Sequence, residues 1–210
     1  MRSYNTLRGI AQFEYSEKRS RFIACATPVS SEREANDFLN QIRKNHPDAR
    51  HTAYAYSIFD GDNFSQKFSD DGEPQGTAGM PMMDILQKKG ITNAAVTVTR
   101  YFGGILLGAP GLLRAYTAAA SGAVSDAGTV TVSVCRRVSI VVEYSFFGKI
   151  EKLYLSYKIN AHTPLFSEKI SIEYDVLEED CDAFIKALTD ATAGRIVIKL
   201  SEPYYLRMDP

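Results

Sequence analysis

Residues 69–81 read SDDGEPQGTAGMP, and residues 97–116 read TVTRYFGGILLGAPGLLRAY. Together the two stretches hold seven of the chain's 14 glycines and three of its 8 prolines. Glycine gives the backbone access to positive φ angles and lets other groups approach closely. Dense, polar, glycine-rich loops beside regular elements therefore predict one shaped surface in the first half of the chain, such as a binding site.

The composition indicates a soluble globular protein without a strong overall charge. The 210 residues are 45% hydrophobic and 23% charged, and the formal net charge is −1. Any nucleic-acid surface must therefore be a local patch. No apolar run approaches the length of a membrane span and no signal-peptide region opens the chain, so we expect a cytoplasmic protein with no membrane partner.

Three widely spaced cysteines argue against a disulfide framework and a local zinc motif. Cys25, Cys135 and Cys181 show no paired spacing. Each stands among apolar or helix-face residues, so we expect buried thiols without catalytic activity.

The first half is expected to alternate strands with helices. The hydrophobic pattern predicts strands at 20–29, 52–59, 63–68 and 94–101. Ser31 and Glu34 form a capping box that opens the first helix. A second helix is expected to start at Pro81 and end at Gly90, and a third, rich in alanine, to span 112–126.

The second half follows the order β-α-β-β-α-β, which is that of the ferredoxin-like unit. Strands are expected at 138–144, 159–166, 170–177 and 195–200. Helices at 148–157 and 179–192 are expected to cover one face of a four-stranded antiparallel sheet. A boundary near 134–137, without a flexible linker, gives domains at 1–134 and 135–210.

Several blocks of the sequence resemble the YigZ/Impact family, also called UPF0029. The most specific blocks are 70–79 and 99–116, and the blocks 18–24 and 51–56 are similar to the family's opening strands. The C-terminal pattern is similar to the small α+β domain of bacterial members.

The resemblance implies an α+β fold in two domains. The first is expected to have a ribosomal-protein-like β-α layout resembling domain four of elongation factor G, and the second to be ferredoxin-like. Eukaryotic members carry an additional N-terminal interaction domain and are regulators of translational control that act by protein contacts. Fold similarity alone does not fix a function.

The second glycine-rich loop has two interpretations. Arg100 ends a strand, and Arg114 is expected in the first turn of the helix that Gly111 precedes. Free N–H groups at that helix start would attract a phosphate or an RNA backbone. The alternative is a structural β-turn-α connection, which is favoured because the loop lacks a lysine-serine ending and a dinucleotide fingerprint. We expect 76–79 and 103–111 to border one groove.

The acidic residues of the first loop also have two interpretations. Asp70, Asp71 and Glu73 could bind Mg²⁺ or act as general acids and bases. Consecutive carboxylates on such a loop are more often solvated or cap a helix, so no metal, cofactor or catalytic residue is assigned. His51 could act in acid–base chemistry, but within an alternating strand it is expected to be a partly buried hydrogen-bonding residue.

Basic residues near the strand ends have two interpretations: scattered positive charge on a neutral domain is more often an ordinary solvated face, and an RNA surface is the alternative. They are interleaved with aromatic residues such as Tyr54 and Phe102, which suits phosphate contact and base stacking. The candidate ligand- or RNA-binding residues are Arg100, Arg114, Gly103, Gly104, Gly108, Gly111, Gly76, Thr77, Lys18, Arg19, Arg21 and His51.

The leading hypothesis is a non-enzymatic regulator or accessory factor of translation that binds RNA, the ribosome or a translation-related protein. One alternative is an enzyme or sensor for a phosphorylated small molecule at the glycine-rich loops, and another is a protein-interaction module. RNA binding should weaken steeply with salt, whereas a small ligand should raise Tm by mass action. The sequence leaves the oligomeric state open.

Overall fold

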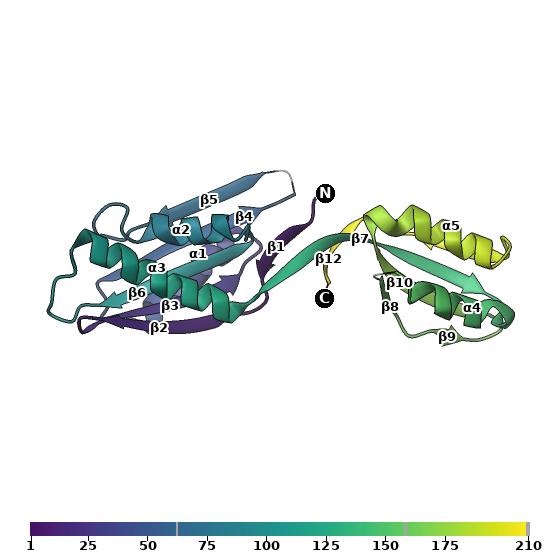
Figure 1. Cartoon of the computed structure of the whole chain (residues 1–210), viewed down its shortest axis with the longest axis horizontal. Coiled ribbons are helices and arrows are strands. Elements are labelled where there is room, and N and C mark those ends of the chain that lie inside the picture. Colours follow the sequence, from purple (N-terminus) through teal and green to yellow (C-terminus); the bar gives the residue numbers. More distant parts are fainter. Residues whose placement is uncertain (62, 158, 209–210) are drawn as a thin grey trace. The chain divides into compact units, whose positions relative to one another are not determined.

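The computed structural model describes residues 1–61, 63–157 and 159–208. The chain forms two compact units: the first comprises Tyr4–Thr131, and the second comprises Met1–Ser3 with Val132–Met208. Both units combine helices with a β-sheet around a hydrophobic core of their own, so the fold class is α+β (Figure 1).

The first unit is built on an antiparallel sheet with the strand order β2-β3-β6-β4-β5. The strands are β2 (Ala11–Glu17), β3 (Ser20–Pro28), β4 (His51–Phe59), β5 (Phe64–Ser69) and β6 (Ala94–Tyr101). The last four lie within one residue of their predicted bounds. No strand is predicted before residue 20, so β2 and the short β1 (Tyr4–Leu7) are additions.

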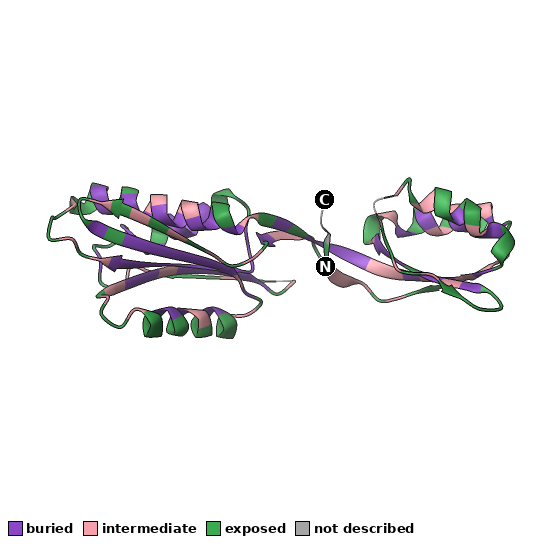
Figure 2. Ribbon diagram, turned by 90° about the horizontal axis from the view of Figure 1, so that it is seen from below, coloured by how far each residue is buried: buried purple, intermediate pink, exposed green. Residues whose placement is uncertain are grey.

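Helices cover both faces of this sheet. Helix α1 (Glu32–Asn45) packs on one face, and α2 (Gly79–Lys88) and α3 (Gly108–Ala127) pack on the other (Figure 2). The predicted N-cap of α1 is confirmed, because the Ser31 hydroxyl accepts a hydrogen bond from the N–H of Glu34 at 3.2 Å.

Two predicted helix starts are wrong, and both errors have the same cause. Helix α2 begins two residues before Pro81, and α3 begins four residues before the predicted start at Leu112. A proline is tolerated anywhere in a first turn, because the first four N–H groups of a helix make no intrahelical hydrogen bond. Pro110 therefore lies inside α3, Gly111 does not precede the helix, and Arg114 lies in its second turn rather than its first.

The second unit follows the predicted order of elements. Its elements are β7 (Thr129–Val142, which begins in the first unit), α4 (Tyr144–Tyr154), β8 (Ile159–Ala161), β9 (Leu165–Phe166), β10 (Ile170–Leu177), a 3₁₀ turn (Glu178–Asp180), α5 (Cys181–Ala191), β11 (Ile196–Leu200) and β12 (Tyr204–Met208). Four of these strands form an antiparallel sheet, as predicted, and their order is β8-β10-β7-β11. The single strand predicted at 159–166 is two short strands, and β12 pairs with β7 as an unpredicted addition.

Both helices of the second unit pack on one face of its sheet. Phe146 and Ile150 of α4 and Phe184 of α5 share a core with alternate residues of β7 and β10, including Ile140 and Tyr174. The opposite face carries Arg137, Ser139, Glu173 and Asp175, the intervening residues of the same strands. No helix of the second unit's described residues packs on that opposite face, which we call the helix-free face.

Candidate functional site

The strand register brings most of the candidate residues to one end of the first sheet. Arg21 of β3 pairs with Tyr101 of β6, and His51 of β4 pairs with Arg100. We call the end where β3 and β4 begin and β6 ends the signature end. The β2–β3 turn, the 70–78 loop and the 102–107 loop all leave the sheet there (Figure 1).

Asp70 caps the start of α2. Its carboxylate accepts hydrogen bonds at 2.9 Å from the backbone N–H groups of Gly76, Ala78 and Gly79. Thr77 is buried and donates its hydroxyl to the carbonyl of Pro74. The candidate residues Gly76 and Thr77 thus belong to the start of α2, where the Asp70 carboxylate already accepts the free N–H groups.

Asp71 anchors the start of β4. Its carboxylate accepts from the N–H of Thr52 and from Nη2 of Arg43, both at 2.7 Å. The backbone carbonyl of Asp71 lies 2.7 Å from Nδ1 of His51, and because a carbonyl only accepts, Nδ1 carries the proton. His51 is half-buried, which is the hydrogen-bonding role expected from its place in an alternating strand.

Glu73 and Arg100 form a buried ion pair. Nη1 of Arg100 donates to both carboxylate oxygens, at 2.8 and 3.0 Å, and each residue is 8% exposed. The hydroxyl of Tyr116 in α3 donates to the same carboxylate at 2.9 Å, and burial together with the Glu73 charge raises the pKa of Tyr116 well above its usual range. All three carboxylates of the first loop are therefore engaged within the fold.

Arg100 lies against two aromatic rings. Its guanidinium carbon is 5.5 Å from the ring centres of both Phe22 and Phe102. Its Nε is buried and has no hydrogen-bond partner among the described residues. The charge of this candidate residue is matched by Glu73, so Arg100 joins β6 to the first loop and orients Phe102.

Gly103 joins the 102–107 loop to the β2–β3 turn. A Cβ atom built on Gly103 would lie 2.0 Å from the backbone carbon of Arg19, and its N–H donates to the hydroxyl of Ser20 at 3.2 Å. Only glycine fits at such a distance. Two loops that are more than eighty residues apart are thus packed together at the signature end.

The β2–β3 turn itself has an unusual sequence for its conformation. Lys18 and Arg19 have φ angles of 45° and 66°, the left-handed pair of a two-residue hairpin turn. Asn-Gly or Asp-Gly is the usual choice there, because other residues adopt positive φ at a cost. Both side chains are exposed, and neither makes an ion pair with any described residue. The sequence indicated both residues as candidates, but the turn that presents them was not predicted because β2 was not.

The signature end carries more unpaired positive than negative charge. Arg21 pairs with Glu14 at 2.8 Å and Arg43 with Asp71, so these two cations are neutralised. Five exposed cations at this end have no ion pair to any described residue: Lys18, Arg19, Lys44, Arg50 and Arg114. The carboxylates there without an ion pair to a described residue are Glu17, Asp48 and Asp70. Helix α3 starts at Gly108 without a side-chain cap, which leaves its first N–H groups available to an anion.

A groove of about 420 Å³ runs between α2 and α3. Gly76 and Met80 line one side, whereas the other side is formed by Leu113, Thr117 and Ser121 of α3 rather than by 103–111. Of the residues expected to border one groove, Gly76 lines this space and 103–111 do not. Both glycine-rich loops leave the same end of the sheet, and a groove shared by both stays a prediction.

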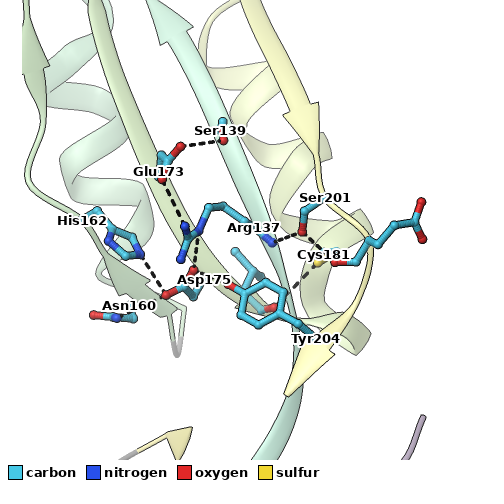
Figure 3. A network of polar contacts seen from close by, with 11 residues as sticks. Arg137, Ser139, Asn160, His162, Glu173, Asp175, Cys181, Ser201 and Tyr204 are labelled. Atoms are coloured by element: carbon cyan, nitrogen blue, oxygen red, sulfur yellow. Dashed lines mark hydrogen bonds and ion pairs between the residues drawn. The ribbon is translucent and has the colours of Figure 1, made fainter. Parts of the chain in front are cut away.

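The second unit contains a polar network that the sequence did not indicate. Asp175 on the helix-free face has a side chain only 2% exposed, and it accepts hydrogen bonds from Nε of Arg137 at 3.0 Å and Nε2 of His162 at 2.9 Å (Figure 3). Asn160 at 3.4 Å and the hydroxyl of Tyr204 complete the set. This carboxylate ties β12 and the segment after β8 to the sheet.

The remaining chemistry is sparse in the part of the chain that the structure describes. Cys25, Cys135 and Cys181 are buried as expected, and burial raises the pKa of each thiol, that of Cys135 to about 11. No group of three metal-ligating side chains is found among these residues. None of their helices is both long and apolar enough to cross a membrane.

The sequence matches the family model of the Impact N-terminal domain over residues 18–124. It is 38% identical to the IMPACT family member YvyE of Bacillus subtilis over 206 residues, which cover 98% of this chain and 94% of that protein. The IMPACT family member YigZ of Escherichia coli is 38% identical over 137 residues, 65% of this chain and 67% of YigZ. Human Protein IMPACT is 34% identical over 97 residues, 44% of this chain and 30% of the human protein.

A crystal structure of a hypothetical protein resembles the whole chain. Its TM-score is 0.61 at 29% identity, and the match covers 94% of this chain and 97% of that one. The mixed arrangement of helices and strands in both halves is thus shared with a solved structure.

Proposed function

The chain belongs to the Impact family, and from this premise we propose that it is a non-enzymatic, translation-associated factor that binds RNA, free or within the ribosome, through the signature end. Its two domains, 1–134 and 135–210, would act in the cytoplasm. We further propose a domain-four-like layout for the first and a ferredoxin-like fold for the second. The strand order β8-β10-β7-β11 with two helices on one face supports the latter.

The observation that carries the RNA proposal is the Lys18-Arg19 turn. Residues held at positive φ against their preference point to a role for their side chains, since the turn alone would favour Asn-Gly. The two cations are exposed and have no ion pair with any described residue, so they are available to phosphates. Lys44, Arg50 and Arg114 extend the same unpaired charge around the signature end.

A small-molecule enzyme or sensor receives less support from the geometry. Asp70 already fills the amides at the start of α2, and Glu73 already neutralises Arg100. Two features of a phosphate cradle are thus used by the fold, whereas the uncapped start of α3 and the Arg114 side chain stay available to an anion. An open, unpaired set of surface cations suits a long polyanion better than a single phosphate.

The experiment replaces Lys18-Arg19 by Asn-Gly, the pair that the turn prefers. Because K18N/R19G keeps the turn, the variant should fold with an unchanged or higher Tm. We expect its RNA affinity, followed by fluorescence anisotropy, to fall about tenfold, and the salt slope to lose roughly 1.4–1.8 units for two phosphate contacts.

The matched control is K88A/K89A, which removes two lysines from the far end of α2. This control should bind RNA like the parent protein. Equal loss of affinity in both variants, or no loss in K18N/R19G, would overturn the proposal.

A further inference from the structure

The 102–107 loop carries three exposed apolar side chains. Leu106 is 84% exposed, Phe102 54% and Ile105 42%, and we call these three residues the apolar tip. Exposed apolar side chains that cluster on one loop are typical of contact sites. The apolar tip lies at the signature end, beside the cations described above.

The loop that carries the apolar tip is anchored at both ends. Gly103 is packed on the backbone of Arg19 and Ser20, and Leu107 packs against the core beneath α3. Arg100 lies over the ring of Phe102 and is itself held by the Glu73 carboxylate. The ring is therefore positioned before any partner arrives, which lowers the entropic cost of binding.

The surrounding charge selects the kind of partner. The backbone of Arg19 packs on Gly103 of the loop, Lys18 precedes Arg19 in the same turn, and Arg114 follows in α3. A partner that satisfies both features must offer negative charge and exposed apolar faces within a few ångströms of each other. RNA with unpaired bases does so, whereas a regular duplex offers phosphates but keeps its base faces stacked.

We propose that the signature end recognises RNA at unpaired bases: Phe102 stacks on one base, Leu106 lies against the neighbouring base or sugar, and Lys18 and Arg19 contact the flanking phosphates. This inference rests on the proposed function and adds the kind of RNA that is bound. Aromatic stacking on a base contributes roughly 5- to 150-fold in affinity. Aliphatic side chains that enter a base step provide a smaller, shape-dependent contribution.

The test uses three labelled RNAs of equal length: a perfect hairpin duplex, the same hairpin with a three-nucleotide bulge, and a single strand. The full chain should bind the bulged and single-stranded RNAs more tightly than the perfect duplex. Phe102→Ala should weaken binding to these two RNAs at least about fivefold and leave both the duplex affinity and the salt slope unchanged. Phe102→Trp, which keeps an aromatic face for stacking, should retain the preference for bulged and single-stranded RNA over the duplex. A purely structural role of the ring gives no reason for this result.

Two exposed apolar residues outside the signature end provide matched controls. Phe64→Ala on β5 and Leu155→Ser after α4 remove side chains that are 59% and 74% exposed. Both should leave all three affinities unchanged. Leu106→Ser should weaken binding to the bulged and single-stranded RNAs by less than Phe102→Ala does.

The outcomes separate the two proposals. If K18N/R19G weakens RNA binding but Phe102→Ala leaves the preference unchanged, this inference is overturned and the proposed function stands. If neither variant changes the affinity, or the parent protein binds none of the RNAs, both are overturned. A tip that docks on an acidic protein surface instead would give unchanged RNA affinities for Phe102→Ala, which also overturns the inference.

Discussion

Arg100 at the end of β6 and Glu73 in the first glycine-rich loop form a buried ion pair at 2.8 Å at the signature end. Such a pair contributes little net stability, because desolvation offsets most of the attraction between the charges. Removing only one of the two partners is strongly destabilising, since the remaining charge would stay buried without a partner. The pair therefore fixes the first glycine-rich loop against the end of β6.

Arg100→Met should destabilise the first unit by about 3–5 kcal/mol. The cause is the uncompensated Glu73 carboxylate, which also keeps the Tyr116 hydroxyl as its neighbour. Urea unfolding measures the loss. In the double variant E73Q/R100M the loss should be smaller than the sum of the two single losses, and simple additivity would show that the pair is not coupled.

Gly103→Ala should destabilise the protein by roughly 1–3 kcal/mol, because the added methyl group would overlap the Arg19 backbone. Gly148→Ala is the matched control. Gly148 lies in α4, and a Cβ there would meet no atom within 4 Å, so the alanine should gain up to about 1 kcal/mol. Thermal unfolding should show a lower Tm for Gly103→Ala and an unchanged or higher Tm for Gly148→Ala. A neutral Gly103→Ala would contradict the close approach of the two loops.

Asp175→Asn should destabilise the second unit at neutral pH by about 1–3 kcal/mol. Burial alone would raise the pKa of Asp175, but hydrogen bonds from Tyr204, His162 and Arg137 hold it below the usual 3.8. A lowered pKa means that the carboxylate stabilises the fold above about pH 4 and loses this contribution as the pH falls below that value.

The difference in unfolding free energy between the parent protein and Asp175→Asn should therefore become smaller as the pH falls below about 4. Urea titrations at neutral pH and at about pH 3 measure it. Asp190→Asn, on the exposed side of α5, should change stability by less than about 0.5 kcal/mol. A difference that grows with acidity would contradict the assigned direction.

The thiols should react slowly in the native protein. Burial raises the pKa of all three, so little thiolate is present at pH 8. A thiol reagent such as DTNB should label fewer than one group rapidly under native conditions and all three cysteines in guanidinium chloride. Fast labelling of native protein, followed by loss of RNA binding, would show that a cysteine is accessible and belongs to the site.

The sequence was sufficient for elements whose local pattern is strong. The β-branched run of β6 and the Ser31 cap of α1 were predicted correctly, since each signal is contained within a few residues. The partners of Asp70, Asp71 and Glu73 were not predictable individually. Their roles as cap, strand anchor and buried ion depend on β4, β6 and α3 being folded beside the loop.

Other features depend on registers between distant strands. Arg137 and Asp175 are cross-strand partners 38 residues apart, so no local pattern connects them. The early start of α3 was not predicted, because glycine and proline at 108–111 favour a loop, although a first turn accepts proline. The resemblance to the Impact family located the signature end, whereas the unpaired cations around it became visible only in the folded unit.

The contact between Gly103 and the Arg19–Ser20 backbone has a consequence for exchanging sequence between family members. The two turns have complementary shapes, so each one limits what the other can become. A chimaera that takes the β2–β3 turn from one parent and the 102–107 loop from another would join surfaces that were never selected together. The natural unit of exchange is the pair of turns, and recombination libraries should keep both from the same parent.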